Sequence, residues 1–251
     1  IQTTLNHEVD IVFSLAEVKA LPNDEYFLTF ADLCLPDAPN GEVVDYVLAK
    51  NWPVIVLTAS NDKATRDKFM DKDILDYIFK ESDTCIDQII DSIVKLERYA
   101  KTKVILALSK LPERNEIKKI LTQRKFNVLA AAHGEEAMSY LNDNSDVKLI
   151  IADANMPVIS GSELLSEVRA RFSDDELGVI ILGDKDDALE ASLLVSGANE
   201  YLVKPLSKES LNCRLDKCLH YMANMQFLSI YNKLDPISGI KNSNALLSCV
   251  E

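Results

Sequence analysis

Three successive apolar runs in the N-terminal part of the chain end on side chains that could act together chemically. Asp32 ends the first run, Thr58 the second and Lys80 the third. An aspartate that ends a buried strand can serve as a nucleophile or as a metal ligand. A hydroxyl and an ammonium group beside it can bind and neutralise a transferred oxygen. The set therefore suits an acyl phosphate on Asp32, with Mg²⁺ neutralising the remaining charge.

Each of these residues also has an ordinary structural explanation. Asp32 could cap the loop after its strand, and Lys80 could be a solvated charge. Their joint occurrence at successive strand ends favours the functional interpretation. A metal-dependent phosphohydrolase would also use a strand-end aspartate, but it usually requires a second acid two residues on, where Cys34 and Asn155 stand.

Short β-branched or aromatic runs alternate with segments of helical period, which predicts βα units and parallel sheets. The expected strands are Val9–Phe13, Tyr26–Phe30, Pro53–Leu57, Ile74–Phe79, Lys103–Leu108, Asn127–Ala131, Val147–Ala152, Val179–Leu182 and Glu200–Val203. The expected helices are Glu42–Lys50, Ile86–Arg98, Pro112–Arg124, Gly134–Asn142, Ser162–Phe172 and Asp187–Ser196. Ligands of such sheets bind beyond the carboxyl ends of the strands, where the chemical side chains stand.

The order of elements occurs twice along the chain, which indicates an internal duplication. We expect two flavodoxin-like, doubly wound α/β domains, each with a five-stranded parallel sheet of order 2-1-3-4-5. The first domain lacks its N-terminal strand in this chain, so we expect roughly one strand and part of a helix to precede Ile1. The expected domains are 1–100, 103–220 and 221–251, the last holding a signalling helix and the start of an output domain.

The first copy resembles the receiver domain of two-component response regulators, the CheY-like domain. That family carries a strand-final Asp, a Pro four residues on, and then a strand-final Thr or Ser and a Lys. The pattern is matched by Asp32, Pro36, Thr58 and Lys80. The resemblance implies that a sensor histidine kinase donates a phosphoryl group to Asp32 in a phosphorelay.

The same resemblance implies a metal site and a conformational switch. Asp32 and the backbone carbonyl of Cys34 would bind Mg²⁺, and Tyr77 would rotate inward when Thr58 moves toward the phosphoryl group. The chain departs from the family in two ways. The acidic pair that follows the first strand is expected upstream of Ile1, and Lys80–Glu81 replaces the usual Lys-Pro.

The second copy keeps the scaffold of this family and loses parts of its site. Asp153, Tyr201 and Lys204 match the pattern, whereas Ser109–Lys110 stands where the acidic pair belongs and Gly183 replaces the Thr or Ser. Mg²⁺ keeps its waters unless carboxylates and phosphate oxygens hold it. We therefore expect a degenerate second site, in a pseudo-receiver.

Two geometric predictions follow for the second copy. The resemblance implies a cis peptide bond at Lys204–Pro205, which X-Pro bonds allow at modest cost. We also expect Lys110 to form a salt bridge with Asp153, in place of the missing metal charge, although it could instead point into solvent.

Composition excludes several other classes of protein. The chain has 251 residues with 47% hydrophobic content, enough for two domains. Its 27 Lys and Arg against 40 Asp and Glu give a formal charge of -13, which disfavours nucleic acid and anionic lipid as partners. No run approaches the ~18 apolar residues of a membrane span, and no signal pattern begins the chain, which predicts a cytoplasmic location. Five scattered cysteines predict neither disulfides nor zinc.

An apolar stripe follows the last strand, along a helix that begins near Ser207. Its members, at alternating spacings of four and three, are Leu211, Leu215, Cys218, Met222 and Met225. This spacing suits the coiled-coil seam of a homodimer, which could also pair through its receiver domains. The alternative is that the stripe packs on the second sheet.

The final segment, Leu234–Leu246, resembles the opening of a GGDEF-type diguanylate cyclase domain. The resemblance implies that the parent protein makes cyclic di-GMP, while this chain carries none of the catalytic residues and is not itself an enzyme. A turn at Asp235–Gly239 followed by a helix start explains the same residues without an enzyme. For the whole chain, the alternative to a phosphorylated regulator is a scaffold of pseudo-receivers that binds partners without phosphorylation.

Overall fold

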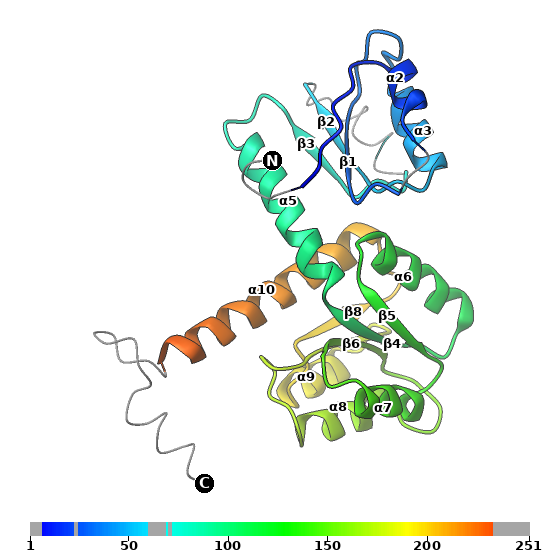
Figure 1. The fold of residues 1–251 in the computed structure, drawn as a ribbon. Helices are drawn as coiled ribbons and strands as arrows, with labels where there is room; N and C mark the ends of the chain where they lie inside the picture. The colour runs from blue at the N-terminus through cyan, green and yellow to red at the C-terminus, as the bar shows by residue number, and fades with distance from the viewer. Residues whose placement is uncertain (1–6, 23–24, 60–68, 70–71, 233–251) are drawn as a thin grey trace. The chain divides into compact units, whose positions relative to one another are not determined.

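The computed structural model describes residues 7–22, 25–59, 69 and 72–232 (Figure 1). The chain divides into two compact units. Unit 1 comprises residues 1–100 with 123–125, and unit 2 comprises residues 101–122 with 126–251. Each unit has its own parallel sheet with helices packed on it. The predicted α/β class, with flavodoxin-like parallel sheets, is confirmed.

Unit 2 contains a five-stranded sheet in the order β5-β4-β6-β7-β8, with every pair parallel. Its strands are β4 (Lys103–Ala107), β5 (Asn127–Ala131), β6 (Val147–Asp153), β7 (Gly178–Gly183) and β8 (Glu200–Val203). Its helices are α6 (Leu111–Gln123), α7 (Gly134–Asp143), α8 (Gly161–Arg169), α9 (Asp187–Val195) and α10 (Lys208–Asn232). The strand order is the predicted 2-1-3-4-5.

The central strands of unit 2 are buried on both faces, as their continuous apolar sequences require. Every residue of β7 is buried, and only one residue of β6 is exposed. Helix α8 begins at a capping box, in which Ser160 accepts from the Glu163 N–H and the Glu163 carboxylate accepts from the Ser160 N–H. The buried strands and the capped start of α8 together fix the position of the carboxyl edge of the sheet.

Unit 1 contains a three-stranded parallel sheet in the order β1-β2-β3. Its strands are β1 (Thr29–Asp32), β2 (Val54–Thr58) and β3 (Asp76–Phe79). Its helices are α2 (Leu15–Ala20), α3 (Glu42–Ala49) and α5 (Cys85–Ala100). The core joins α3 to the sheet through Val44, Val47, Trp52, Val54 and Val56, all buried.

The predicted strand at Val9–Phe13 is not formed. In unit 2 the corresponding strand, β5, pairs only with β4. Among its described residues unit 1 has no counterpart of β4, so the backbone of Val9–Phe13 has no neighbouring strand to complete its hydrogen bonds. A cavity of about 540 Å³ lies along Leu28–Asp32 instead, and the hydroxyl of Thr29 is buried there without a hydrogen-bond partner. The strand expected upstream of Ile1 stays a prediction.

Helix α2 was not foreseen from the sequence. It begins after Ser14, whose hydroxyl accepts a hydrogen bond of 3.2 Å from the Glu17 N–H. Ser followed three residues later by Glu is a recognised signal of a helix start. The signal was therefore present in the sequence.

The apolar stripe of α10 packs on the sheet of unit 2. Four of its members are buried, namely Leu211, Leu215, Cys218 and Met222. A Cβ added to Gly178 of β7 would lie 2.7 Å from the Met222 sulfur and 3.3 Å from the Cys218 sulfur, so the helix lies directly against the strand. The prediction of a dimer seam is wrong for these four residues because the core of their own unit uses them. Met225 alone of the stripe is exposed, at 39%.

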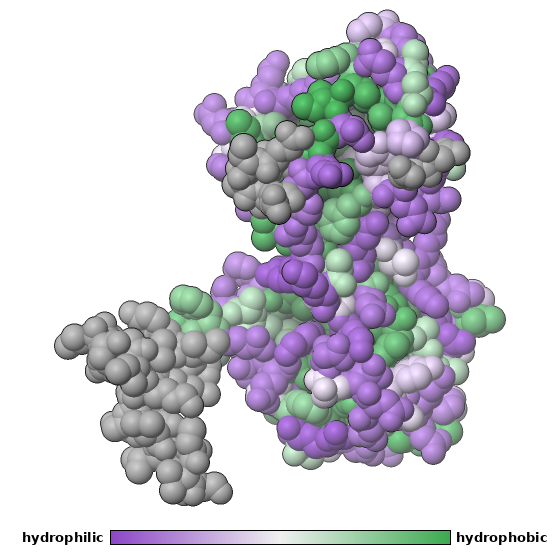
Figure 2. All heavy atoms as spheres, viewed as in Figure 1, coloured by the Kyte–Doolittle hydropathy of each residue, from purple (hydrophilic) through white to green (hydrophobic). Residues whose placement is uncertain are grey.

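Hydrophilic residues cover much of the visible face of each unit, as Figure 2 shows. Of the helices in the described parts of the chain, none has the length and apolar character needed to span a membrane. The segment that resembles a GGDEF opening, Leu234–Leu246, lies outside the described residues.

Candidate functional site

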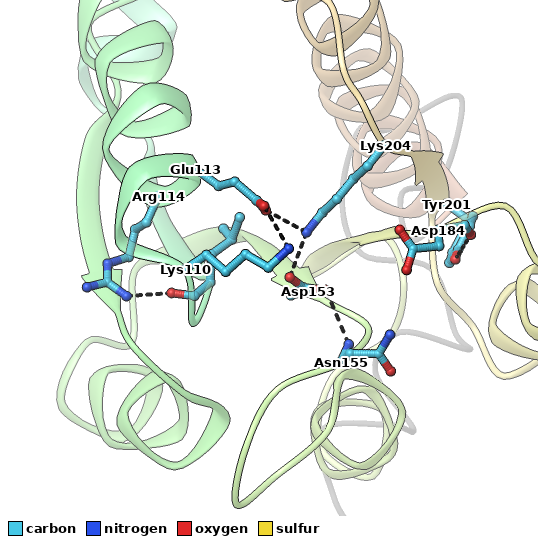
Figure 3. Close-up of polar contacts among 9 residues, drawn as sticks. Lys110, Glu113, Arg114, Asp153, Asn155, Asp184, Tyr201 and Lys204 are labelled. Carbon is cyan, nitrogen blue, oxygen red and sulfur yellow. Dashed lines mark hydrogen bonds and ion pairs between the residues drawn. The ribbon is translucent and has the colours of Figure 1, made fainter.

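Asp153 and Lys204 meet at the carboxyl edge of the sheet in unit 2 (Figure 3). Asp153 ends β6, and the Lys204 Nζ lies 2.6 Å from its Oδ2. The other oxygen, Oδ1, accepts a hydrogen bond of 3.2 Å from the Asn155 N–H. Asp153 is only 5% exposed. A buried carboxylate must be paired, and here both of its oxygens have donors.

A second carboxylate, Glu113, reaches this site from the first turn of α6. Its Oε2 lies 2.8 Å from the Lys204 Nζ, and its Oε1 lies 3.0 Å from the Lys110 Nζ. The predicted salt bridge between Lys110 and Asp153 is therefore wrong. Lys110 pairs with Glu113, which stands three residues later, within easy reach at a helix start. Figure 3 shows Glu113 between the two lysines.

The pKa values of the network reflect these ion pairs. Hydrogen bonds from Lys204 and then Lys110 lower the pKa of Glu113 below its ordinary value. Burial opposes the charge of Lys204, but its bonds to Asp153 and Glu113 outweigh that effect and raise its pKa. We call Lys110, Glu113, Asp153 and Lys204 the unit 2 charge network; its two ammonium groups and two carboxylates neutralise each other.

The switch position of unit 2 has a distinct geometry. Tyr201 is 5% exposed, and its hydroxyl donates a hydrogen bond of 2.7 Å to the backbone oxygen of Asp184. Gly183 ends β7, and a Cβ built on it would lie 2.0 Å from the Tyr201 hydroxyl oxygen. The ring therefore occupies the space that a side chain at position 183 would need. The Lys204–Pro205 peptide bond is cis, as predicted.

Unit 1 repeats the central contacts of this site with the same atoms. The Lys80 Nζ contacts Oδ2 of Asp32, and the Cys34 N–H donates a hydrogen bond of 3.1 Å to Oδ1 of Asp32. The Asp32 and Lys80 side chains are 35% and 33% exposed. The pair in unit 1 is thus open to solvent, where that of unit 2 is enclosed.

The two other predicted site residues of unit 1 lie in matching register. Thr58, buried, ends β2 opposite Phe79, as Gly183 ends β7 opposite Val203. Tyr77, half-buried, pairs with Val56 two positions earlier, as Tyr201 pairs with Ile181. Because β2 lies between β1 and β3, Thr58 ends the strand between those that bring Asp32 and Lys80 together.

The oxygen donors of unit 1 suit Mg²⁺ better than those of unit 2. Mg²⁺ is commonly held by one or two carboxylates together with phosphate oxygens, and it keeps several waters. Asp32 offers one carboxylate near solvent, and Cys34, an exposed residue, follows two positions later. In unit 2, Asp153 is 5% exposed, and Glu113 also holds the lysine with which Asp153 pairs. Within the described ranges, no cluster of three or more His, Cys, Asp or Glu side chains could hold a metal by itself.

The fold and these strand-end residues define a flavodoxin-like α/β module with an Asp–Lys pair at the carboxyl edge of each sheet, and comparison with known proteins identifies its family. Residues 112–216, nearly all of them in unit 2, match the family of the response regulator receiver domain. A chemotaxis protein CheY homolog of Campylobacter jejuni is 38% identical over 110 residues, 42% of this chain and 83% of that protein. Chemotaxis protein CheY1 of Helicobacter pylori is 38% identical over 96 residues, 37% of this chain and 76% of that protein. The chain belongs to the response regulator receiver family.

A solved structure resembles the chain over most of its length. It is described as a two-component system response regulator/GGDEF domain protein, with a TM-score of 0.75 and 29% sequence identity. The match covers 88% of this chain and 91% of that chain. The likeness therefore extends over far more than one receiver domain.

Proposed function

We propose that this chain is the input part of a phosphorelay response regulator, in which Asp32 of unit 1 accepts a phosphoryl group from a sensor histidine kinase. The contact between Asp32 and Lys80 at the carboxyl edge carries the proposal. Thr58 ends the strand that lies between theirs. A nucleophile, a cation and a hydroxyl at one edge are the groups that phosphoryl transfer needs.

The reaction uses each of these groups in turn. A carboxylate oxygen of Asp32 attacks phosphorus while the bond from phosphorus to the donor's histidine nitrogen breaks, so an acyl phosphate forms and the imidazole leaves. Lys80 then pairs with the new negative charge, and Thr58 donates a hydrogen bond to a phosphoryl oxygen. Mg²⁺, when bound, neutralises phosphoryl charge beside Asp32 and Cys34. The move of Thr58 makes room for Tyr77 to turn inward.

Unit 2 takes a different role in this proposal, as a pseudo-receiver. Asp153 is 5% exposed and is already paired with Lys204, so attack on phosphorus would first require this enclosed pair to open. Glu113 holds Lys204 in addition, and the network is neutral without a metal. Unit 2 itself fits the alternative hypothesis of a scaffold that works without phosphorylation.

The rest of the proposal concerns organisation and output. We propose receiver domains at 1–100 and 103–220, and a signalling helix with the start of a GGDEF output domain at 221–251. The solved response regulator/GGDEF domain protein supports this arrangement through its 88% coverage of the chain. The parent protein would then be a diguanylate cyclase controlled by unit 1.

We also propose that the chain pairs with a second copy of itself through α10, by a stripe that shares only Met225 with the predicted one. Tyr221, Met225 and Leu228 are exposed at 43%, 39% and 50%, and they stand at spacings of four and three. That spacing is the heptad pattern of a coiled-coil seam. They lie on the face of α10 next to the buried stripe, and they are exposed in unit 2.

Labelling with a small phosphodonor tests the phosphoryl acceptor. The full chain is incubated with radiolabelled acetyl phosphate and Mg²⁺, and wild type is compared with Asp32→Asn and Asp153→Asn. We expect Asp32→Asn to abolish the label and Asp153→Asn, the matched change at the equivalent position, to leave it near the wild-type level. Equal labelling of wild type and Asp32→Asn would refute the acceptor assignment. No labelling of any form would favour the scaffold.

A further inference from the structure

We infer that Gly183 is a positioning residue that leaves the space for Tyr201 in its inward position, so that unit 2 keeps one switch conformation with no phosphoryl group bound. The inference deepens the proposed pseudo-receiver role of unit 2. It does not depend on whether Asp32 accepts a phosphoryl group. Its basis is the steric relation between two residues on neighbouring strands.

The space above Gly183 is filled by the tyrosine ring. A Cβ at position 183 would lie 2.0 Å from Oη, 2.7 Å from Cζ and 3.1 Å from Cε2 of Tyr201. Carbon atoms do not approach other atoms at the first two distances, so any side chain at 183 would have to displace the ring. The backbone does not require glycine here, because the positive-φ glycines of the described residues are Gly41 and Gly197. Glycine at position 183 therefore serves to leave room for the Tyr201 ring.

Hydrogen bonds hold the Tyr201 ring in the space that Gly183 leaves open. The Tyr201 hydroxyl donates to the backbone oxygen of Asp184, the residue next to Gly183. The Lys204 N–H donates a hydrogen bond of 2.8 Å to the Gly183 oxygen, so β7 and β8 are joined on both sides of the tyrosine. Burial, and then the carboxylates of Asp186 and Asp184, raise the pKa of Tyr201. The hydroxyl therefore stays protonated and remains a donor at neutral pH.

The two units differ at this position. Thr58 carries a side chain at the register where unit 2 has Gly183, and Tyr77 is half-buried where Tyr201 is buried. In unit 1 an inward tyrosine must compete with the threonine for space, so its position can depend on where Thr58 lies. In unit 2, Gly183 has no side chain that could compete with Tyr201 for this space, so we expect the ring to keep one position.

Fluorine NMR can test this in the full chain, with 3-fluorotyrosine placed at position 201. We expect one signal, protected from a soluble gadolinium chelate and unchanged by Mg²⁺ with beryllofluoride, a phosphoryl mimic. Gly183→Thr should shift the signal and increase its relaxation by the chelate severalfold. A wild-type signal that is exposed, or that moves with beryllofluoride, would overturn the inference. So would a Gly183→Thr signal that stays protected.

A double-mutant cycle keeps the inference testable if Gly183→Thr folds poorly. The smaller change Gly183→Ala is made in the wild type and in Tyr201→Leu, which removes the hydroxyl and Cζ that the new Cβ would meet. We expect Gly183→Ala to lower the urea midpoint of unit 2 clearly in the wild type and far less in Tyr201→Leu. Equal losses in both backgrounds would show that Gly183 serves the backbone and not the ring. Neither experiment involves phosphorylation, so failure of the Asp32 assignment would leave both results unchanged.

Discussion

The enclosed pair Lys204–Asp153 and the open pair Lys80–Asp32 should respond very differently to the loss of their lysine. Lys204→Met leaves Asp153, whose side chain is 7% exposed, with the Asn155 N–H as its remaining donor among the described contacts. Stranding a buried charge costs about 3–5 kcal/mol. The hydrogen bond from the Asn155 N–H is present before and after the change and cancels, so we expect unit 2 to lose about 3–5 kcal/mol.

The same change in unit 1 should have a small effect. Lys80→Met leaves Asp32, whose side chain is 35% exposed, free to be hydrated by water. Pairs this open contribute about 0–1 kcal/mol. We therefore expect unit 1 to lose less than about 1 kcal/mol in Lys80→Met, although the contacts are made by the same atoms as in unit 2.

Native-state hydrogen exchange with peptide-resolved mass spectrometry reads the two units separately in the full chain. Amides of β6 and β7 report on unit 2, and those of β2 report on unit 1. Trp52, the only tryptophan of the chain, is buried in unit 1 and gives an independent fluorescence signal for that unit. Lys103→Met is the matched control within unit 2, because the acidic partner of Lys103, Asp146, has a side chain that is 62% exposed.

Two outcomes would refute this reasoning. If Lys204→Met costs unit 2 no more than Lys103→Met does, the unit 2 charge network does not stabilise the domain. If Lys80→Met and Lys204→Met destabilise their units equally, exposure does not determine the strength of these pairs.

The remaining predictions concern Glu113 and the exposed stripe of α10. Because ion pairs lower the pKa of Glu113, its stabilising effect is present above its ordinary value of 4.5 and is lost as the pH falls through the lowered pKa. Glu113→Gln should therefore lower the urea midpoint of unit 2 clearly at pH 7 and much less at pH 3. The control Glu116→Gln, on the exposed face of α6, should have the midpoint of the wild type at both pH values. If the chain dimerises through the stripe, Met225→Glu should make it monomeric in light scattering at concentrations where wild type is dimeric, while Asn224→Glu should not. A dimer that survives Met225→Glu would exclude this seam.

Much of the fold could be predicted from the sequence because its strands are continuous apolar runs that tolerate few other structures. Val179–Leu182 lies within β7 and Glu200–Val203 coincides with β8. Val9–Phe13 shows the limit of such reasoning. Its sequence suits a strand, but a strand forms only where a neighbour completes its hydrogen bonds, and that depends on the rest of the sheet.

The site residues at strand ends, Asp153 and Lys204, could be predicted from the sequence. The site residue on a helix, Glu113, could not. Asp153 and Lys204 follow strands whose carboxyl ends share an edge, so their meeting followed from topology. Glu113 was missed because its reach to Lys204 depends on how α6 lies over that edge. Its spacing of three from Lys110 was a visible signal of an ion pair, but of a pair on the helix and not of a site.

The role of Gly183 also lay beyond the sequence. A missing hydroxyl at this position predicts the loss of a phosphate contact, but only the structure shows that Tyr201 fills the space. For the α10 stripe, the sequence pattern was visible but was compatible with two different structures. Its heptad spacing through Met222 was real, but the spacing of a coiled-coil seam is also that of a helix packed on its own sheet.

The two aspartate sites share a lysine contact but differ in exposure, and residue-level mapping of the phosphoryl group would show which of them reacts. The chain is treated with acetyl phosphate and Mg²⁺, and each acyl phosphate is reduced with borohydride to homoserine, which mass spectrometry locates. We expect homoserine at Asp32, dependent on Mg²⁺, and unmodified Asp153 in the same sample. Homoserine at Asp153, or at both positions in similar amounts, would show that Asp32 is not the selective acceptor.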